Sequence, residues 1–367
     1  MKKVGKVIGI VLLILILIVT AYVAYVMLSY RRIEDKQTLT VDVPAAQEAD
    51  LPEIAAKEQE FMIVTANVGF GAYDPEFDFF MDGGTQSWGK SEERVKENLT
   101  GMLAEIKTVD PDFLLLQEVD IDGTRSYHIN QYEMVKEALP EYATVFAQNY
   151  DSAFLFWPLN QPHGKNQAGI VTAANTVIES GLRRSLPISE SFSKFLDLDR
   201  CYSISRLPVD DGRKLVLFNV HLSAYGVDMD ILNAQRNMLY EDMIAEYAAG
   251  NYVIVGGDFN HDMVGDSASR FENAADEAAS WAKQFDFVSI PEGFTLGSKK
   301  LVDEGVSDMA PTCRDAGRAY DGTNDCWVLD AMIWSDNVEM LEYGTLDLDF
   351  RFSDHNPVQM KFRLRSE

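Results

Sequence analysis

The stretch "YVIVGGDFNHD", Tyr252–Asp262, joins an apolar run to a group of polar residues. The run is rich in valine and isoleucine, which is typical of a buried strand. After two glycines it changes to carboxylate, amide and imidazole side chains. In an extended chain Asp258 and Asn260 point to one face and Phe259 to the other. We expect Phe259 to pack, the glycines to leave room beside neighbouring site residues, and Asp258 and Asn260 to form one wall of a functional site.

Other predicted strands end in the same way. Their polar residues are Asn67 in "VTAN", Glu118 in "LLLQE", Asn219 and His221 in "LFNVH", Asp330 in "WVLDAM", and Asp354 and His355 in "FSDHNP". Each alone is ordinary, because polar residues commonly form the turns after strands. If all these ends converge, they build a buried site rich in carboxylates. Such a site needs a compensating cation, because unpaired buried charge is costly.

Strand patterns outnumber helical ones, and the two alternate along residues 61–367. Ser91 and Asp228 are suited to cap two amphipathic helices. We therefore predict one α+β domain over 61–367, with helices packed outside the sheets.

The first 30 residues differ from the rest. After three lysines, Val7–Leu28 contains no charged residue. As a helix this stretch spans roughly 30 Å, enough to cross a bilayer. We predict an uncleaved signal-anchor over 1–30, with a cleaved secretory signal as the alternative. The short basic tail favours a single-pass orientation with the C-terminal part outside the cytoplasm.

Residues 31–60 are polar and are predicted to be a linker. The chain carries −26 and residues 1–30 carry +3, which leaves −29 for residues 31–367. This charge disfavours tight binding of long nucleic acid, which requires a basic surface. Of three cysteines, Cys313 and Cys326 either pair or remain two free thiols.

The ordered motifs "TANVGF", "LLLQEVD", "NVHLS", "GGDFN", "LDAMIW" and "SDHNPV" resemble those of the endonuclease/exonuclease/phosphatase superfamily. They run from Thr65 to Val358. The resemblance implies a four-layered α/β/β/α sandwich of two mostly antiparallel sheets with outer helices. It also implies hydrolysis of a phosphate ester with Mg²⁺, or alternatively Mn²⁺.

The resemblance assigns roles residue by residue. Glu118 matches the main metal ligand, Asn67 helps to place the metal, and Asp354 reaches a metal. Asp330 orients His355, and the base is either His355 or Asp258. Asn260 matches a residue that binds phosphate oxygen and positions water, and His221 matches a histidine near the leaving group or phosphate.

Four further residues are candidates for substrate binding. Arg125 either clamps a phosphate or pairs with a nearby aspartate. His163 and Lys165 lie in a loop rich in Pro, Gly and Asn, and Arg314 lies in "PTCRDAG". The aromatic residues Phe154, Phe156 and Trp157 of that loop are predicted to pack rather than to bind bases or lipid.

The sequence thus predicts a membrane-anchored, metal-dependent phosphoesterase. Its substrate is nucleic acid, a phospholipid head group or a small phosphorylated molecule. Alternatives are an extracytoplasmic nuclease or a sphingomyelinase-like lipid phosphodiesterase. A non-catalytic surface binding module is the alternative of a different class. Nothing in the sequence indicates an oligomer.

Overall fold

A computed structural model describes residues 2–44, 51–54, 59–195, 198–224, 228–273 and 282–365. The helices are α1 (Lys2–Ser29), α2 (Glu92–Lys107), α3 (Gln131–Ala138), α4 (Met229–Ala248), α5 (Ser267–Arg270) and α6 (Gly297–Asp303). The 3-10 helices are η1 (Gly69–Gly71), η2 (Phe80–Asp82), η3 (Thr124–Ser126), η4 (Phe192–Phe195) and η5 (Phe287–Ser289).

The strands form two seven-stranded sheets and one small ribbon. The first sheet has the order β1 (Gln37–Leu39), β7 (Ser180–Ser185), β8 (Cys201–Pro208), β9 (Lys214–His221), β10 (Tyr252–Asp258), β14 (Asp330–Ser335), β11 (Phe294–Leu296). The second has the order β15 (Val338–Thr345), β16 (Val358–Leu364), β3 (Phe61–Asn67), β4 (Phe113–Gly123), β6 (Asn166–Ala174), β5 (Ala143–Asp151), β2 (Val41–Asp42). The ribbon pairs β12 (Cys313–Arg314) with β13 (Cys326–Trp327).

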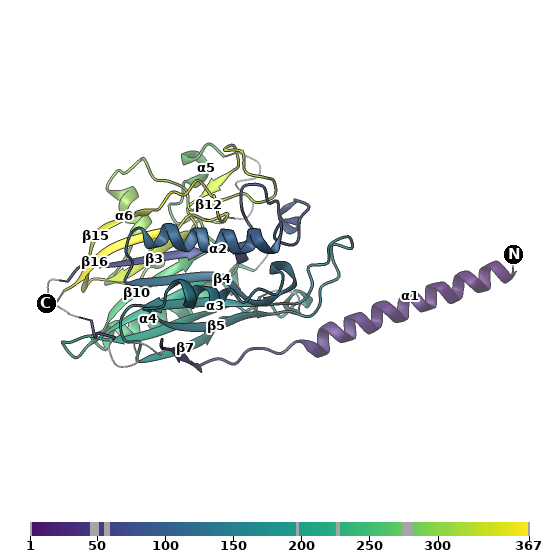
Figure 1. Ribbon diagram of the computed structural model, residues 1–367, viewed down its shortest axis with the longest axis horizontal. Helices are drawn as coiled ribbons and strands as arrows, with labels where there is room; N and C mark the ends of the chain where they lie inside the picture. The colour runs from purple at the N-terminus through teal and green to yellow at the C-terminus, as the bar shows by residue number, and fades with distance from the viewer. Residues whose placement is uncertain are drawn as a thin grey trace.

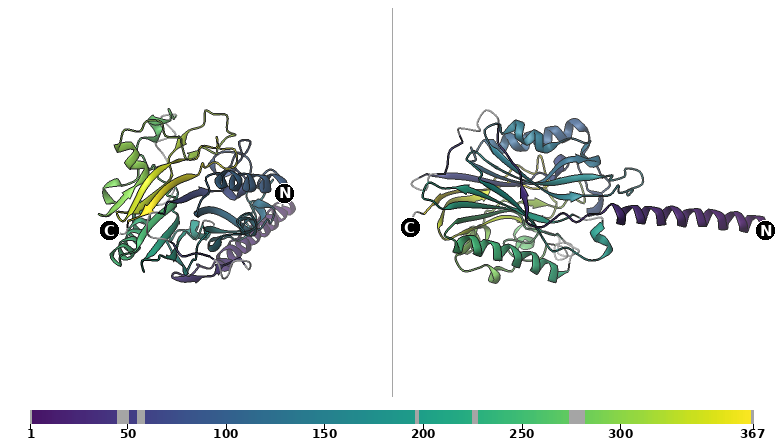
Figure 2. Two further views of the ribbon diagram at one scale, coloured as in Figure 1. Left: turned by 60° about the vertical axis from the view of Figure 1, so that its left-hand side comes forward. Right: turned by 90° about the horizontal axis from the view of Figure 1, so that it is seen from below.

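The two large sheets pack face to face, with helices on their outer faces (Figures 1 and 2). Within each sheet one pair is parallel, β9 with β10 and β3 with β4, and the other pairs are antiparallel. The apolar core between the sheets includes Phe61, Leu115, Leu217, Ile254 and Met332. The predicted four-layered sandwich of mostly antiparallel sheets is confirmed.

The outer helices begin where the sequence predicts. The Ser91 side chain accepts a hydrogen bond from the Arg94 amide at the start of α2, and Asp228 caps α4 through the Asp230 amide. Apolar residues of α2 and α3 cover the second sheet, and those of α4 cover the first. Ile106 and Met243 are fully buried representatives of these two layers.

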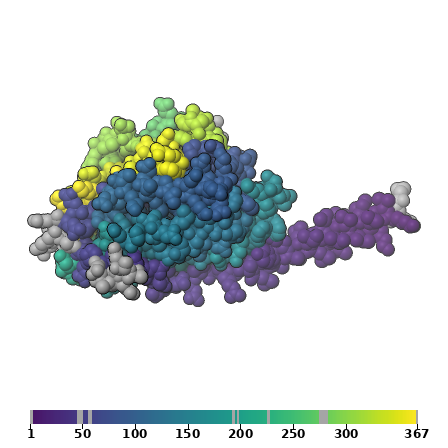
Figure 3. Space-filling view, viewed as in Figure 1, coloured from purple at the N-terminus to yellow at the C-terminus, as the bar shows by residue number. Residues whose placement is uncertain are grey.

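Helix α1 projects from the sandwich as a separate rod (Figures 1 and 3). It is long and apolar enough to cross a membrane, a property that N-terminal signal sequences share.

The segment after α1 is not a free linker over its first part. Residues 37–39 add strand β1 to one sheet by pairing with β7, and residues 41–42 add β2 to the other by pairing with β5. Ile54 is buried in the core between the sheets. These strand pairings could not be predicted from the polar composition of 31–60, because edge strands need little apolar surface. Residues 45–50 and 55–58 of the predicted linker lie outside the described residues.

Candidate active site

Polar strand ends from both sheets meet at one end of the sandwich. β3 runs parallel to β4, and β9 runs parallel to β10, so Asn67, His221 and Asp258 end their strands on the same side. β14 and β16 run antiparallel to these neighbours and begin there, so Asp330 lies opposite Asp258 in the ladder. The strand-end cluster comprises Asn67, Glu118, His221, Asp258, Asp330, Asp354 and His355.

His355 and Asp330 form the closest pair in this cluster. His355 Nδ1 lies 2.7 Å from Asp330 Oδ2, and both side chains are buried. Burial alone would lower the pKa of His355, but the Asp330 carboxylate raises it well above its usual value. The imidazole is therefore charged at neutral pH, with Nε2 turned toward Asp258 at 3.9 Å.

Asp258 occupies the centre of the strand-end cluster. Its Oδ2 accepts a hydrogen bond from Asn67 at 3.1 Å and lies 3.6 Å from His221 Nε2. Burial raises the pKa of Asp258 to about 6, although the His355 charge opposes this rise. At neutral pH the carboxylate is mostly ionised, yet it still binds a proton readily.

Glu118 lies at an irregularity in β4. The pairing of β4 with β6 shifts register between Leu116 and Val119, and Glu118 adopts a positive φ of 57°. A bulge of this kind re-aims a side chain. The Glu118 carboxylate accepts a hydrogen bond from Asn67 Nδ2 at 3.1 Å. Positive φ is uncommon for glutamate, and such strain concentrates at functional sites.

Asn67 connects the two carboxylates through one amide. Its Nδ2 donates to both Glu118 and Asp258, while its Oδ1 accepts the Gly69 amide at 3.0 Å. Ser353 Oγ donates to the Asn67 carbonyl at 2.9 Å and accepts the amide of His355 at 3.2 Å. These bonds hold the side chains from two separate parts of the chain in one arrangement.

Asp354 carries a carboxyl whose pKa is raised far above its usual value. Burial raises its pKa to about 7, His355 and Arg314 oppose the rise, and the charge of Glu118 adds to it. The carboxylates of Glu118 and Asp354 therefore repel each other. A bound cation would remove this repulsion.

The donor set fits a hard divalent cation. The carboxylates of Glu118 and Asp354 lie close enough to repel each other, and oxygen ligands of this kind suit Mg²⁺. Asp330 Oδ1 is buried and has no hydrogen-bond partner in the described part of the chain. A second group, Asp258, Asp330 and His355, brings one ligand atom from each residue within 4.8 Å of the others.

His221 differs from His355 although both are buried. Burial, and then the charge of Arg200, lower the pKa of His221 well below its usual value, so this imidazole is neutral. Among the described residues its Nδ1 has no hydrogen-bond partner. The other ring nitrogen, Nε2, is the one that faces Asp258.

The chain turns immediately after Asp258. Strand β10 ends there, and Asn260 has a positive φ of 51°, so the extended geometry expected for Asn260 does not hold. Its amide nitrogen donates to Asp258 Oδ1 at 2.8 Å, and its side chain donates to the Leu222 carbonyl at 3.0 Å. Phe259 is buried in the outer core, as expected.

The two glycines before Asp258 serve packing rather than other site residues. A Cβ at Gly257 would lie 2.0 Å from the Val220 carbonyl oxygen, so β9 and β10 require glycine there. A Cβ at Gly256 would lie 2.8 Å from Leu115 of the facing sheet.

The four substrate-binding candidates, Arg125, His163, Lys165 and Arg314, form what we call the loop shell. Arg125 is buried and donates to Asp120 through Nε at 3.1 Å and Nη2 at 2.7 Å. Its guanidinium lies 3.9 Å from the centroid of the Phe70 ring. The geometry places Arg125 with its aspartate rather than toward a substrate.

His163 and Lys165 have partners outside the strand-end cluster. His163 is buried against Ser87, with Nδ1 3.0 Å from the Ser87 hydroxyl, and burial and Arg125 lower its pKa to about 3. Lys165 is exposed, and its Nζ lies 3.9 Å from Asp151.

Arg314 of the loop shell lies close enough to Asp354 for its charge to act on that carboxyl. It is buried and donates to the carbonyls of Tyr73, Asp74 and Asp315, while its charge lowers the pKa of Asp354. Its Nε has no partner among the described residues. The adjacent Cys313 and Cys326 are free thiols.

Sequence reasoning missed the residues that support the cluster. The Thr312 hydroxyl accepts the amides of Leu329 and Asp330 at 2.8 and 3.0 Å. Gln117 donates to Asn219 at 2.8 Å and so joins the two sheets below the site. Asn219 stands in a quoted motif, but its partner could not be identified without the sheet packing.

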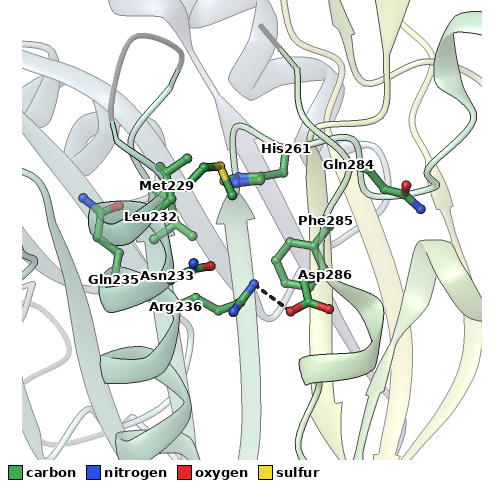
Figure 4. A pocket seen from close by; sticks show the side chains of 10 residues that line it. Met229, Leu232, Asn233, Gln235, Arg236, His261, Gln284, Phe285 and Asp286 are labelled. Carbon is green, nitrogen blue, oxygen red and sulfur yellow. Dashed lines mark ion pairs between the residues drawn. The ribbon is translucent and has the colours of Figure 1, made fainter. Parts of the chain in front are cut away.

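A cavity of about 260 Å³ lies beside the site (Figure 4). Leu222 and His261 at its rim directly follow His221 and Asn260 in the chain. Figure 4 shows Arg236 of α4 reaching across to Asp286, with 3.2 Å between the charged atoms. The cavity is thus next to the cluster, and the Arg236–Asp286 ion pair forms part of its wall.

Several solved structures share this fold. An endonuclease/exonuclease/phosphatase from Beutenbergia cavernae matches with a TM-score of 0.53 and 16% identity, covering 84% of this chain and 72% of its own. The human Nocturnin catalytic domain with bound sulfate matches at 0.52 and 19%, covering 88% and 98%. D. rerio TDP2 with a single-strand DNA product matches at 0.54 and 13%, covering 83% and 100%.

No curated protein matches the sequence. The family model "Endonuclease/Exonuclease/phosphatase family" matches residues 64–355, which contain the whole strand-end cluster. The chain belongs to the endonuclease/exonuclease/phosphatase family.

Proposed function

We propose that this protein is a membrane-anchored, divalent-metal-dependent phosphoesterase that hydrolyses a phosphodiester or phosphomonoester with an activated water. One observation carries the proposal. A charged His355–Asp330 pair and a carboxylate of raised pKa, Asp258, lie beside the acidic pair of Glu118 and Asp354. This arrangement combines a proton acceptor, a fixed cation and a cation-binding site.

The metal assignment follows from which carboxylates are already occupied. Asp330 is engaged with His355, so the group of Asp258, Asp330 and His355 suits proton handling better than metal binding. Glu118, with Asn67 and Asp354, would hold Mg²⁺, with Mn²⁺ as the alternative. The metal would supply positive charge to the phosphate oxygens and the leaving group.

The pKa values favour Asp258 over His355 as the base. Asp258 accepts the proton that the attacking water loses as its oxygen bonds to phosphorus and the opposite P–O bond breaks. His355 is already protonated, so it donates a hydrogen bond to a phosphoryl oxygen, and Asp330 holds it in this state. The neutral imidazole of His221 and the side-chain amide of Asn260 would make the remaining contacts to the phosphate.

The net charge of the domain limits which classes of substrate are plausible. With −29 on residues 31–367, a long nucleic acid is repelled, so we favour a lipid head group or a small phosphorylated molecule. A nuclease is the second candidate, because the chain shares its fold with TDP2, whose structure contains a single-strand DNA product. A non-catalytic binding module is disfavoured because all seven strand-end residues are present.

Helix α1 would hold the domain at the cell membrane as a single-pass anchor with the domain outside the cytoplasm. Cleavage of α1 as a secretory signal is the alternative. Protease added to intact cells should trim the domain, and protection of the domain would contradict this orientation.

The catalytic proposal is tested with bis-p-nitrophenyl phosphate and the full chain in detergent. We expect hydrolysis with Mg²⁺ or Mn²⁺, none in excess EDTA, and recovery when metal is restored. Unchanged turnover in EDTA would contradict the metal role. A panel of DNA, RNA, sphingomyelin and inositol phosphates then ranks the substrate classes.

A further inference from the structure

The loop between β5 and β6 exposes apolar side chains at the end of the sandwich that carries the site. Residues 153–164 contain no Asp, Glu, Lys or Arg. Phe156, Trp157 and Leu159 are 52%, 66% and 77% exposed. The prediction that Trp157 packs in the protein is therefore wrong, whereas Phe156 packs against the Phe154 ring and keeps about half of its surface exposed. A cluster of this kind on an uncharged loop marks an interaction surface.

The same loop contacts the last turns of α1. The Tyr22 hydroxyl donates to the Phe154 carbonyl at 3.0 Å, and the Phe154 amide donates to the Tyr25 hydroxyl at 3.2 Å. The rings of Tyr22 and Phe156 meet edge to face at 5.2 Å between centroids. Loop and helix thus form one continuous apolar and aromatic surface.

These contacts set the depth of the loop relative to α1. The last apolar residue of α1 is Leu28, six residues after Tyr22. At 1.5 Å per residue, Tyr22 lies roughly 9 Å inside that end. If Val7–Leu28 crosses a bilayer, Phe156 must lie at or below the head-group level, where aromatic rings are favoured.

The segment after α1 prevents the domain from swinging away from this position. Arg32 pairs with Asp199, and the Ile33 amide donates to Asp199 Oδ2 at 2.6 Å. Arg183 donates to the Glu34 carbonyl at 3.1 Å, and β1 then joins the sheet. Residues 32–39, which follow α1, are therefore docked on the sandwich instead of forming a free linker.

The site faces the same way as this surface. The loop leads into β6, whose first residue, Asn166, is paired with Gly123 at the site end of β4. In Figures 1 and 2 the loop and the C-terminal end of α1 lie at one end of the sandwich, and the C-terminus of the chain lies at the other. The strand-end cluster thus lies at the end nearest to α1.

We propose that Phe156, Trp157 and Leu159 insert into the bilayer interface beside α1, so that the active-site end of the domain faces the membrane surface. This inference rests on the proposed membrane anchoring. The occupant of the apolar surface is the bilayer that holds α1, because the two are continuous and the loop carries no charge that would resist insertion.

The test places an environment-sensitive fluorophore on single cysteines in the full chain, reconstituted in phosphatidylcholine vesicles that contain nitroxide-labelled lipid. A Cys326→Ser background leaves only buried thiols, Cys201 and Cys313. Leu159→Cys reports the loop, Leu17→Cys reports α1, and Asp336→Cys reports an exposed turn at the opposite end of the sandwich.

We expect the lipid nitroxide to quench the labels at 17 and 159 and to leave the label at 336 unchanged. If the label at 17 is quenched and the label at 159 is not, the anchor stands and the loop insertion is wrong. If neither is quenched, the proposed membrane anchoring fails as well. These two failures are therefore distinguishable.

A loop variant separates insertion from mere proximity. Phe156→Ser with Trp157→Ser should reduce quenching at 159 severalfold, whereas Phe156→Leu with Trp157→Phe should retain it. Both variants should hydrolyse bis-p-nitrophenyl phosphate at the unmodified rate, which shows that they fold. Equal quenching in the serine and apolar variants would overturn the proposal.

Discussion

The strand-end cluster and the loop shell lie at neighbouring positions, but the protein satisfies their polar groups to different degrees. In the loop shell, the Arg125 guanidinium donates hydrogen bonds to Asp120 and stacks over the Phe70 ring. In the strand-end cluster, buried atoms of His221 and Asp330 have no hydrogen-bond partner within the described part of the chain, and the carboxylates of Glu118 and Asp354 repel each other. Buried polar groups are normally paired, so these atoms support the proposed ligand site.

Arg314 is intermediate between these two regions. It donates to three backbone carbonyls as a structural residue would, yet its charge lowers the pKa of Asp354 and its Nε has no partner among the residues that the structure describes. Residue type and loop position therefore do not separate the proposed functional groups from structural ones. We propose that the hydrogen-bond state of each group does, and this can be tested by measuring activity and stability separately.

The largest effect on activity is expected for Glu118→Gln. Losing a metal ligand should lower kcat/KM by about 10³-fold or more, because the metal supplies several kcal/mol of transition-state stabilisation. Thermal stability without metal should be kept or raised, because the repulsion with Asp354 is relieved. Melting curves of both proteins and kinetics measured over a range of metal concentrations test this. A fully active variant would contradict the metal role of Glu118.

Arg125→Met should have the opposite profile. It leaves Asp120 buried without its cation, which costs about 3–5 kcal/mol of unfolding free energy. The folded fraction should keep its KM for substrate, as measured by denaturant unfolding and by kinetics below the transition. Full stability together with a large rise in KM would instead show that Arg125 binds substrate.

Asp330→Asn should reduce turnover by about 10²-fold, because His355 loses its charge and its fixed orientation. Burial then dominates, so the pKa of His355 falls below its value in the unmodified protein. Histidine NMR titration is practical with five histidines in the chain. His221, which stays neutral, is the internal control, and an unchanged His355 titration would refute the pairing.

This substitution also has a pH signature in stability. In the unmodified protein the raised pKa of His355 stabilises the folded state below the unfolded pKa of about 6.5, and this contribution is lost as pH rises through the folded pKa. The stability difference between the two proteins should therefore shrink at high pH.

The smallest effect is expected for Lys165→Ala. Its exposed ammonium lies 3.9 Å from Asp151, and such surface pairs contribute little. Activity and melting temperature should change by less than about twofold and about 1 °C respectively. A tenfold rise in KM on a phosphate substrate would instead assign the loop a binding role.

The sequence predicted the elements whose signals are local. The caps at Ser91 and Asp228 and the apolar strands were recognisable because hydrogen bonds and side-chain periodicity act within a few residues. The order of the motifs was enough to predict the family and the set of residues that converge, and the ladder of β9, β10 and β14 brings His221, Asp258 and Asp330 together as expected.

Only the tertiary structure decided which partners these residues have. The pairing of Arg32 with Asp199 joins residues 167 positions apart, and it turns part of a polar stretch from linker into a docked segment. The exposure of Trp157, the bulge at Glu118 and the occupied state of Arg125 likewise depend on neighbours distant in the sequence. Composition tells which groups are polar or apolar, but burial and pairing arise only when the sheets close on each other.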